Sequence, residues 1–298
     1  MNNNRKPVSK KKITLLCIGF LLLLLLFALD PRLLVRTYKI EDEKINAPVR
    51  IALITDLHSC RYGKKQANLI ETVHQQAPDL IFLVGDIFDD ILDDTNTKFF
   101  IEEITKQYPC YYVTGNHEYW AGKERFDEQM EILHKNGVHI LSGRTEVKNI
   151  SGVNLRICGI NDPEVYKVEV DIADNPQEYF RRDLNSEADF IRQLEQVSES
   201  VSATEYTILL SHRPEYFETY SKYPFDLILC GHAHGGQWRI PFLLNGLYAP
   251  HQGMFPEYAG GLYEAENNKM IVSRGLARET TYIPRIFNRP ELVIIDLK

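Results

Sequence analysis

The chain has 298 residues, of which 44% are hydrophobic and 25% are charged. This is ordinary globular composition, and it excludes collagen-like, low-complexity and wholly disordered classes. The net charge of −7 is unevenly distributed: the first 12 residues hold five of the 34 basic residues and no acid, so 29 basic residues stand against 41 acidic ones afterwards, a net of −12. A body this acidic argues against nucleic-acid binding through a basic surface, and we expect no nucleic-acid partner.

An uncharged apolar run follows the basic start of the chain. Ile13–Leu29 has 17 residues and includes six consecutive leucines, Leu21–Leu26. As a helix it would be about 25 Å long, close to the ~30 Å hydrocarbon core of a bilayer. A buried soluble helix is disfavoured because the run has no polar face. We therefore predict a basic cytoplasmic tail over residues 1–12 and a transmembrane signal anchor over 13–29.

Cleavage of this run as a signal peptide is the alternative to a retained anchor. It is disfavoured because Phe27-Ala28-Leu29-Asp30-Pro31 contains no clear small-x-small cleavage site. Five basic residues precede the run, whereas three lie in the first ten residues after it: Arg32, Arg36 and Lys39. This bias favours a single-pass protein in the cell membrane with its N-terminus in the cytoplasm and its body on the extracytoplasmic side.

The body shows apolar runs that alternate with helical patterns. Residues 30–48 are predicted as a polar stem with a short edge strand near 38–45. Strands are predicted at 50–54, 80–84, 110–114, 207–211, 227–230, 270–274 and 292–297, with a hairpin of 147–150 and 155–160. Helices are predicted at 64–76, 97–107, 122–135 and 186–197. The pattern favours one α/β domain over residues 49–298, with mixed sheets and helices outside them.

Four cysteines lie in this body: Cys60, Cys110, Cys158 and Cys230. An even number outside the cytoplasm is compatible with two disulfides. However, the last three lie in or beside apolar runs typical of buried strands, where a thiol behaves as a small hydrophobe. We therefore expect no structural disulfide.

Five short polar clusters each follow a predicted strand. They are Asp56-Leu57-His58; Gly85-Asp86 with Asp89; Gly115-Asn116-His117-Glu118; Ser211-His212; and Gly231-His232-Ala233-His234-Gly235-Gly236. Any one of them alone is typical of a turn, but all five in order indicate a site at the carboxyl ends of strands. Their Asp, Asn and His donors suit Mn, Fe or Zn. The sequence has neither the cysteine cluster typical of a structural zinc site nor the carboxylate-rich loop typical of a calcium site.

The ordered series resembles the calcineurin-like metallophosphoesterases, which carry D-x-H, G-D-x-x-D, G-N-H-[DE], H and G-H-x-H. The matched span is Asp56–His234, and no member of the motif set is missing. The N-terminal apolar run, Ser211-His212-Arg213-Pro214-Glu215 and Gly-His-x-His-Gly-Gly-Gln together resemble the membrane-associated bacterial branch, which is similar to UDP-2,3-diacylglucosamine pyrophosphatase-like phosphodiesterases.

The resemblance implies a four-layer αββα sandwich of two mixed β-sheets with two divalent metal ions at the strand ends, manganese being favoured. One metal would be held by Asp56, His58 and His234, the other by Asn116, His212 and His232, with Asp86 bridging them. A bridging hydroxide would attack the phosphorus of a phosphodiester or pyrophosphate. His117 would be the catalytic residue beside the metals, which protonates the leaving oxygen or stabilises phosphoryl charge.

Four further residues have two interpretations each. Asp89 would hold a histidine ring or cap a helix, and Glu118 is similarly ambiguous. Arg213 would reach a substrate phosphate or form a surface pair. His251 lies in the aromatic segment Trp238–Tyr263, which would line an apolar groove for a lipid or a nucleobase, or else pack as an irregular loop.

Three classes of function follow. A membrane-anchored phosphoesterase for a lipid or envelope substrate is favoured over one that acts on soluble nucleotides or phosphoproteins. A catalytically inactive metal-binding interaction module is disfavoured because the set of chemical groups is complete. No partner protein is implied.

Overall fold

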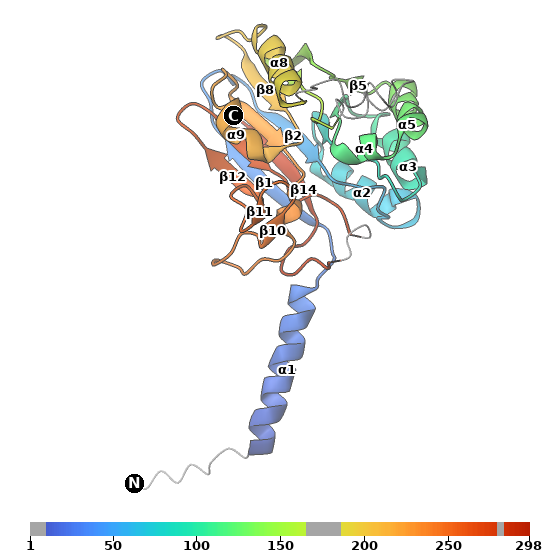
Figure 1. The fold of residues 1–298 in the computed structure, drawn as a ribbon, viewed down its shortest axis with the longest axis vertical. Coiled ribbons are helices and arrows are strands. Elements are labelled where there is room, and N and C mark those ends of the chain that lie inside the picture. Colours follow the sequence, from blue (N-terminus) through green and yellow to red (C-terminus); the bar gives the residue numbers. More distant parts are fainter. Residues whose placement is uncertain (1–9, 165–185, 279–282) are drawn as a thin grey trace, which may run out of the picture.

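The computed structural model describes residues 10–164, 186–278 and 283–298. One long N-terminal helix, α1, extends away from a folded body that contains the strands (Figure 1). This helix spans Lys10–Ala28, compared with the predicted 13–29, and nearly all of its side chains are exposed. The helix is long and apolar enough to cross a membrane. A signal sequence near an N-terminus would meet the same two criteria.

The first sheet has the strand order β1-β14-β2-β3-β4-β5. Strands β2 to β5 run parallel to one another, β14 is antiparallel to β2, and β1 is parallel to β14. The bounds are β1 (Leu34–Ile40), β2 (Val49–Ile54), β3 (Leu80–Val84), β4 (Cys110–Val113), β5 (His139–Ile140) and β14 (Glu291–Leu297). The segment predicted as a stem therefore supplies the edge strand β1, which begins at Leu34 rather than near Tyr38.

The second sheet has the strand order β12-β13-β9-β8-β7-β6. Its four central strands are parallel, and the two outer ones pair antiparallel to their neighbours. The bounds are β6 (Arg144–Ile150), β7 (Val153–Gly159), β8 (Tyr206–Leu210), β9 (Leu227–Cys230), β12 (Gly261–Glu264) and β13 (Lys269–Val272). A separate small hairpin joins β10 (Tyr248–Ala249) to β11 (Gly253–Met254).

Helices cover the outer faces of both sheets. Beside the first sheet lie η1 (Lys64–Gln66), α2 (Ala67–Gln76), α3 (Thr95–Ile104), α4 (Asn116–Trp120) and α5 (Lys123–Lys135). Beside the second lie α8 (Ser186–Ser198), η2 (Pro214–Tyr216) and α9 (Phe217–Tyr220), and the short turn η3 (His234–Gly236) follows β9.

The core consists of three apolar layers, one between the two sheets and one under the helices on each outer face. Successive side chains of a strand alternate between two of these layers. In β2, Ile51 and Leu53 face the layer between the sheets, whereas Ala52 and Ile54 face the helices α2, α3 and α5. In β9, Leu227 and Leu229 face inward and Ile228 faces α8 and α9. Side chains of a strand alternate between its two faces, so strands that are apolar throughout must be buried on both. The predicted arrangement of two mixed sheets between outer helices is confirmed.

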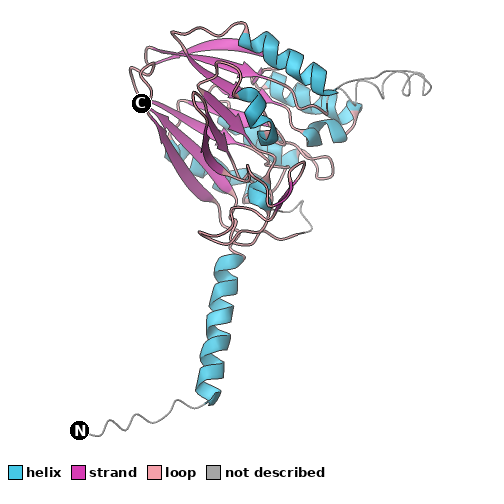
Figure 2. Ribbon diagram, turned by 60° about the vertical axis from the view of Figure 1, so that its left-hand side comes forward, coloured by secondary structure: helices cyan, strands magenta, loops and turns pink. Residues whose placement is uncertain are grey.

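The direction of the strands determines which end of the body carries the site. Strand β1 begins six residues after Ala28, the end of α1, and runs parallel to β14, with Leu34 beside Glu291. Because β14 is antiparallel to β2, the carboxyl ends of β2, β3 and β4 lie at the end of the sheet where α1 leaves. Figure 2 shows this end of the body as a set of loops directly beside α1.

All five cysteines lie in the described residues and are free. Cys17 is exposed on α1, and the four cysteines of the body are buried. Burial raises the pKa of Cys110 to about 12, so this thiol stays protonated and packs as an apolar side chain.

Candidate metal centre

The five polar clusters meet at the carboxyl ends of strands from both sheets. Strands β2, β3 and β4 of the first sheet and β8 and β9 of the second each end one or two residues before one of them. The backbone N–H of His232, after β9, donates to Asp56 Oδ1, after β2, at 2.9 Å. The loops of the two sheets are therefore joined directly at the site.

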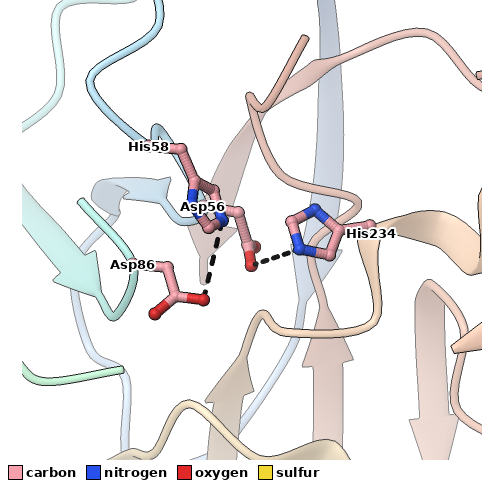
Figure 3. Close-up of side chains that lie close together, drawn as sticks. All are labelled: Asp56, His58, Asp86 and His234. Atoms are coloured by element: carbon pink, nitrogen blue, oxygen red, sulfur yellow. Dashed lines mark ion pairs between the residues drawn. The ribbon is translucent and has the colours of Figure 1, made fainter. Parts of the chain in front are cut away.

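Two groups of potential ligands share one carboxylate. The first contains Asp56, His58, Asp86 and His234, and the second contains Asp86, His212 and His232. In each group the nitrogen and oxygen atoms that could bind a cation lie within 4.8 Å of one another. Figure 3 shows the first group, with its four side chains directed toward a common point. His58 Nε2 lies 3.6 Å from Asp86 Oδ2, and His234 Nε2 lies 3.8 Å from Asp56 Oδ1.

All seven predicted ligands have a buried donor or acceptor atom that makes no hydrogen bond. The atoms are Asp56 Oδ2, His58 Nε2, Asp86 Oδ2, Asn116 Oδ1, His212 Nε2, His232 Nδ1 and His234 Nδ1. Buried polar atoms are nearly always paired, since an unpaired one costs about 1–3 kcal/mol. Two of the seven, His212 Nε2 and Asp86 Oδ2, lie 3.0 Å apart as an ion pair, and all the residues but Asn116 belong to the two groups of potential ligands. Such a set fits the binding of cations by oxygen and nitrogen donors. The ligand assignment itself stays a prediction.

Backbone strain is concentrated at the same residues. Asp56, His58, Asp86, His232 and His234 all have positive φ, between 47° and 65°. This left-handed conformation is unfavourable for residues with a side chain, and it persists only where the surrounding structure enforces it. Strain of this kind is typical of functional loops.

Two histidine rings are held by hydrogen bonds through Nδ1. His58 Nδ1 lies 2.9 Å from Asp89 Oδ1, and His212 Nδ1 lies 3.0 Å from the carbonyl oxygen of Val84. In each ring, a proton on Nδ1 leaves Nε2 as the atom that binds a metal once Nε2 has released its own proton. Asp89 Oδ2 also accepts the N–H groups of Ile91 and Leu92. Asp89 thus both holds a histidine ring and caps a turn, whereas the cap of helix α3 is Asp94.

The ring of His232 is oriented by Arg213 and His251. His232 Nε2 lies 2.9 Å from His251 Nδ1 and 3.1 Å from Arg213 Nη1. His232 Nδ1 is the ring nitrogen without a hydrogen-bond partner, so it is the atom available to bind a metal. Arg213 is buried and forms a two-point ion pair with Asp162. It is therefore not a surface partner, and its guanidinium faces the site through His232.

His117 lies beside the two groups and is held by a carboxylate. Its Nδ1 is 2.6 Å from Asp90 Oδ1, and its ring centroid is 4.3 Å from that of His58. The half-exposed Trp120 lies on its other side, with ring centroids 4.7 Å apart. The side chain of His117 keeps 22% of its surface exposed, whereas those of His58 and His212 keep 1% or less. The ring of His117 is thus more open to a substrate than those of His58 and His212.

Glu118 binds the backbone of the neighbouring loop and does not face the two groups. Its buried carboxylate accepts the N–H groups of Asp86, Ile87, Phe88 and Gly115, at 2.8–3.1 Å. Gly115 lies so close to Asp86 that a Cβ there would collide with the Asp86 carboxylate. Glu118 and Gly115 therefore position the loop that presents Asp86.

The pKa values of the buried carboxylates and histidines show that Asp86 stays negatively charged in the site. Burial raises the pKa of Asp56, but His212 and His117 overcome the same effect at Asp86 and hold its pKa well below the usual range. Burial lowers the pKa of His212, yet Asp86 and Asp56 raise it overall to about 10. Burial lowers the pKa of His232 and His234 well below the ordinary value, so both rings are neutral, the form that binds metals.

The segment Trp238–Tyr263 divides into a packed part and an exposed part. Tyr258 and Tyr263 pack against the second sheet, and their rings are 5.1 Å apart. Trp238, Phe242, Tyr248 and Phe255 are exposed. The predicted apolar groove beside the metals stays a prediction, and of this segment it is His251 that contacts a predicted ligand.

The sequence analysis missed two carboxylates. Asp90 holds His117, and Asp162 holds Arg213. Asp90 directly follows Asp89, the last residue of the second polar cluster, so the pair of adjacent acids was an available signal. Asp162 follows β7 as the other clusters follow their strands, but its partner is 51 residues away in sequence, and no local pattern connects the two.

Comparison with known proteins identifies relatives of this arrangement. The model of the calcineurin-like phosphoesterase family matches residues 49–236. An uncharacterised metallophosphoesterase of Campylobacter jejuni is 28% identical over 89% of this chain and 63% of its own length, so the chain spans less than two thirds of that relative. Phosphodiesterase YaeI of Escherichia coli is 27% identical over 84% of this chain and 83% of its own length.

A solved structure has the same fold. The crystal structure of a dimetal phosphatase from Danio rerio aligns with a TM-score of 0.50 at 13% identity, over 77% of this chain and 88% of that one. The family match covers more than half of the chain and includes each of the five polar clusters that converge at the strand ends. The chain belongs to the calcineurin-like phosphoesterase family.

Proposed function

We propose that this protein is a membrane-anchored, dinuclear-metal phosphoesterase that hydrolyses a phosphodiester or pyrophosphate bond in a lipid or cell-envelope substrate. The observation that carries the proposal is the pair of ligand groups that share Asp86, built from buried atoms without hydrogen-bond partners. The name of the Escherichia coli relative, a phosphodiesterase, supports a diester over a monoester substrate.

The residues of the site divide into those that hold metals and those that act on the substrate. Asp56, His58 and His234 would hold one divalent cation, Asn116, His212 and His232 the other, and Asp86 both. When bound, two such cations stabilise charge on phosphoryl oxygens and make water nucleophilic near neutral pH.

His117 is the side chain that would protonate the leaving group. With Nδ1 held by Asp90, its Nε2 is the nitrogen that can give a proton to the leaving oxygen. The 2.6 Å contact between Nδ1 and Asp90 Oδ1 fixes the orientation of the ring. The ring of Trp120 packs against that of His117, with centroids 4.7 Å apart.

The anchor and the lipid substrate are supported by two features at one end of the molecule. The helix α1 is apolar over nearly its whole length and follows a basic tail. The carboxyl ends of β2, β3 and β4, which carry the site, lie at the end of the sheet where α1 leaves. A site so placed is near the headgroups of the bilayer in which α1 would lie, and a lipid phosphate is then its nearest substrate.

Removal of metal tests the reaction class. Full-length protein in detergent should hydrolyse bis-p-nitrophenyl phosphate faster than p-nitrophenyl phosphate. Chelation should reduce turnover to background, and Mn²⁺ should restore it. The reason is that the seven predicted ligands offer lone pairs, which cannot bind an anionic phosphate unless cations lie between them. Unchanged turnover after chelation, with metal content verified as zero, would contradict a metal-dependent reaction. Soluble nucleotides and phosphopeptides, assayed beside phospholipids and lipid pyrophosphates, test the alternative substrate class.

Accessibility to protease tests the anchor. The intact protein should remain in membranes after carbonate extraction, because α1 supplies a continuous apolar surface. In spheroplasts, protease added outside should digest the body. A body that resists digestion until the cells are lysed would reverse the proposed orientation. A soluble mature protein that begins near residue 30 would instead indicate cleavage.

A further inference from the structure

Two neighbouring loops at the α1 end of the body expose apolar side chains to an unusual extent. They are the loop after η3 and the β10–β11 hairpin with the residues after it. The exposed fractions are 50% for Ile240, 111% for Phe242, 81% for Leu243, 58% for Met254 and 66% for Phe255. We call these five residues the apolar tip. Large apolar side chains exposed together on two joined loops are typical of an interaction site.

The turn that carries the first part of the tip is held by backbone hydrogen bonds. The N–H of Ile240 donates to the carbonyl of Leu244 at 3.0 Å, and that of Leu243 donates to the carbonyl of Ile240 at 2.9 Å. Phe242 has a positive φ of 67°, as does Phe255 at 59°. An exposed phenylalanine in this unfavourable conformation is maintained by the turn around it, so its exposure is built into the fold.

The second loop is joined to the first by the backbone. The N–H of Phe255 donates to the carbonyl of Leu247 at 2.7 Å, and the N–H of Leu247 donates to the carbonyl of Gly236 at 2.9 Å. Gly236 closes η3, the turn that contains His234. The tip is therefore continuous with the loop that presents a predicted metal ligand.

A short chain of hydrogen bonds also fixes the tip to the end of α1. The N–H of Phe287 donates to the carbonyl of Ala28, the last residue of α1, at 2.7 Å. The preceding residue, Ile286, accepts the N–H of Arg239 at 2.9 Å and forms an isolated bridge with Trp238. Figure 1 shows β10 and β11 at the end of the body from which α1 leaves.

We propose that the apolar tip inserts into the interface of the bilayer that α1 crosses, and so holds the metal-site end of the sheets against the lipid surface. This inference rests on the anchor in the proposed function. A bilayer is the occupant that the structure favours, because the apolar surface of α1 and the tip are joined through Phe287 and Ile286. Aromatic side chains such as Trp238 and Phe242 are typical of the interface. Loops with apolar tips bind there through buried apolar area.

Fluorescence quenching by brominated lipid tests this position in the full-length protein. The chain has two tryptophans, Trp120 and Trp238. In a Trp120→Phe/Trp238→Phe background, Phe242→Trp places one reporter at the tip. Ala203→Trp is the matched control, since Ala203 is exposed in the loop before β8, at the opposite end of the parallel strands. Both proteins are reconstituted into nanodiscs of phosphatidylethanolamine and phosphatidylglycerol, with or without bromine at acyl carbons 6 and 7.

We expect the emission of Phe242→Trp to fall by about half in brominated lipid, because an interfacial side chain lies within reach of the upper acyl chain. The emission of Ala203→Trp should not change. Phe255→Trp provides a second reporter if Phe242→Trp does not fold. Equal emission of both tip reporters in the two lipids would overturn the proposal. Emission that shifts with protein density in the discs, without quenching, would also overturn it and indicate a second copy as the occupant.

The outcome can be separated from failure of the proposed function. The same discs, made with the unaltered chain, are assayed for carbonate-resistant insertion and for Mn²⁺-dependent hydrolysis of bis-p-nitrophenyl phosphate. Inserted and active protein with unquenched tip reporters rejects the tip position alone. Protein that is not inserted, or that lacks metal-dependent turnover, rejects the anchor or the reaction class instead.

Discussion

Asp86→Ala is expected to remove metal binding and turnover together. Asp86 is the residue common to both ligand groups, and its Oδ2 is buried without a hydrogen-bond partner. Its loss should leave each cation with one ligand fewer and lower turnover by at least ~10³-fold, or about 4 kcal/mol of barrier. Metal content measured by mass spectrometry on the purified protein, beside turnover of bis-p-nitrophenyl phosphate, checks both effects in one sample.

Two variants make this result interpretable. Asp86 Oδ1 also accepts the N–H of His117 at 2.9 Å, so Asp86→Ala removes a structural contact as well as a charge. Asp86→Asn keeps the amide oxygen for that contact and should still lose metal. Asp127→Ala, on the exposed face of α5 where Asp127 pairs with Lys123, should keep both metals and full turnover. Two bound metals and normal turnover in Asp86→Asn would exclude the bridging role.

His117→Ala should lower turnover without loss of metal. The ring is outside the two ligand groups that share Asp86 and is held by Asp90 at 2.6 Å. Loss of a general acid typically costs about 10²–10⁴-fold, or roughly 3–5 kcal/mol of barrier. The loss should be smaller for a p-nitrophenyl ester than for an alkyl ester, since p-nitrophenolate leaves without protonation. Steady-state kinetics on both esters, with metal content measured in parallel, checks this pattern.

Asp90→Asn is the companion variant. Its amide oxygen can still accept from His117 Nδ1, but the negative charge beside the ring is removed, so the alkyl ester should again be affected more than the p-nitrophenyl ester. If His117→Ala loses turnover equally on both esters while metal is retained, the general-acid role is wrong and stabilisation of phosphoryl charge remains. If His117→Ala loses metal, the ring is a ligand instead.

The sequence predicts the central strands well because burial on two faces leaves a simple pattern. Leu80–Val84 and Leu227–Cys230 are apolar at every position, and the structure places β3 and β9 within the same bounds. The short helix α4 was missed because five residues, Asn116–Trp120, make too few turns for a helical period. Strand β1 was displaced by four residues in the prediction, since an edge strand with one exposed face carries a weaker apolar pattern.

The predicted ligands come together because each follows a strand and the strands are parallel, two properties that are local in sequence. The hydrogen bonds that orient these side chains are not local. His212 is held by the carbonyl of Val84, and His232 by His251 and Arg213, across separations of 19 to 128 residues. Such pairs depend on the register between sheets, which a pattern of apolar residues does not specify.

The place of β14 in the first sheet has a consequence for the order in which the chain can fold. β14 is synthesised after every other strand that the structure describes, yet it lies between β1 and β2 and is the only described neighbour of β1 in that sheet. Until Glu291–Leu297 leaves the ribosome, β1 has no partner and one edge of β2 is open. An anchored chain would then insert into the membrane early, while β1 remained unpaired and the body could move relative to α1. Pairing of the seven residues of β14 with β1 would fix the body to α1. A stop codon before Glu291 should therefore leave a chain that still inserts but exposes strand edges, a state prone to aggregation.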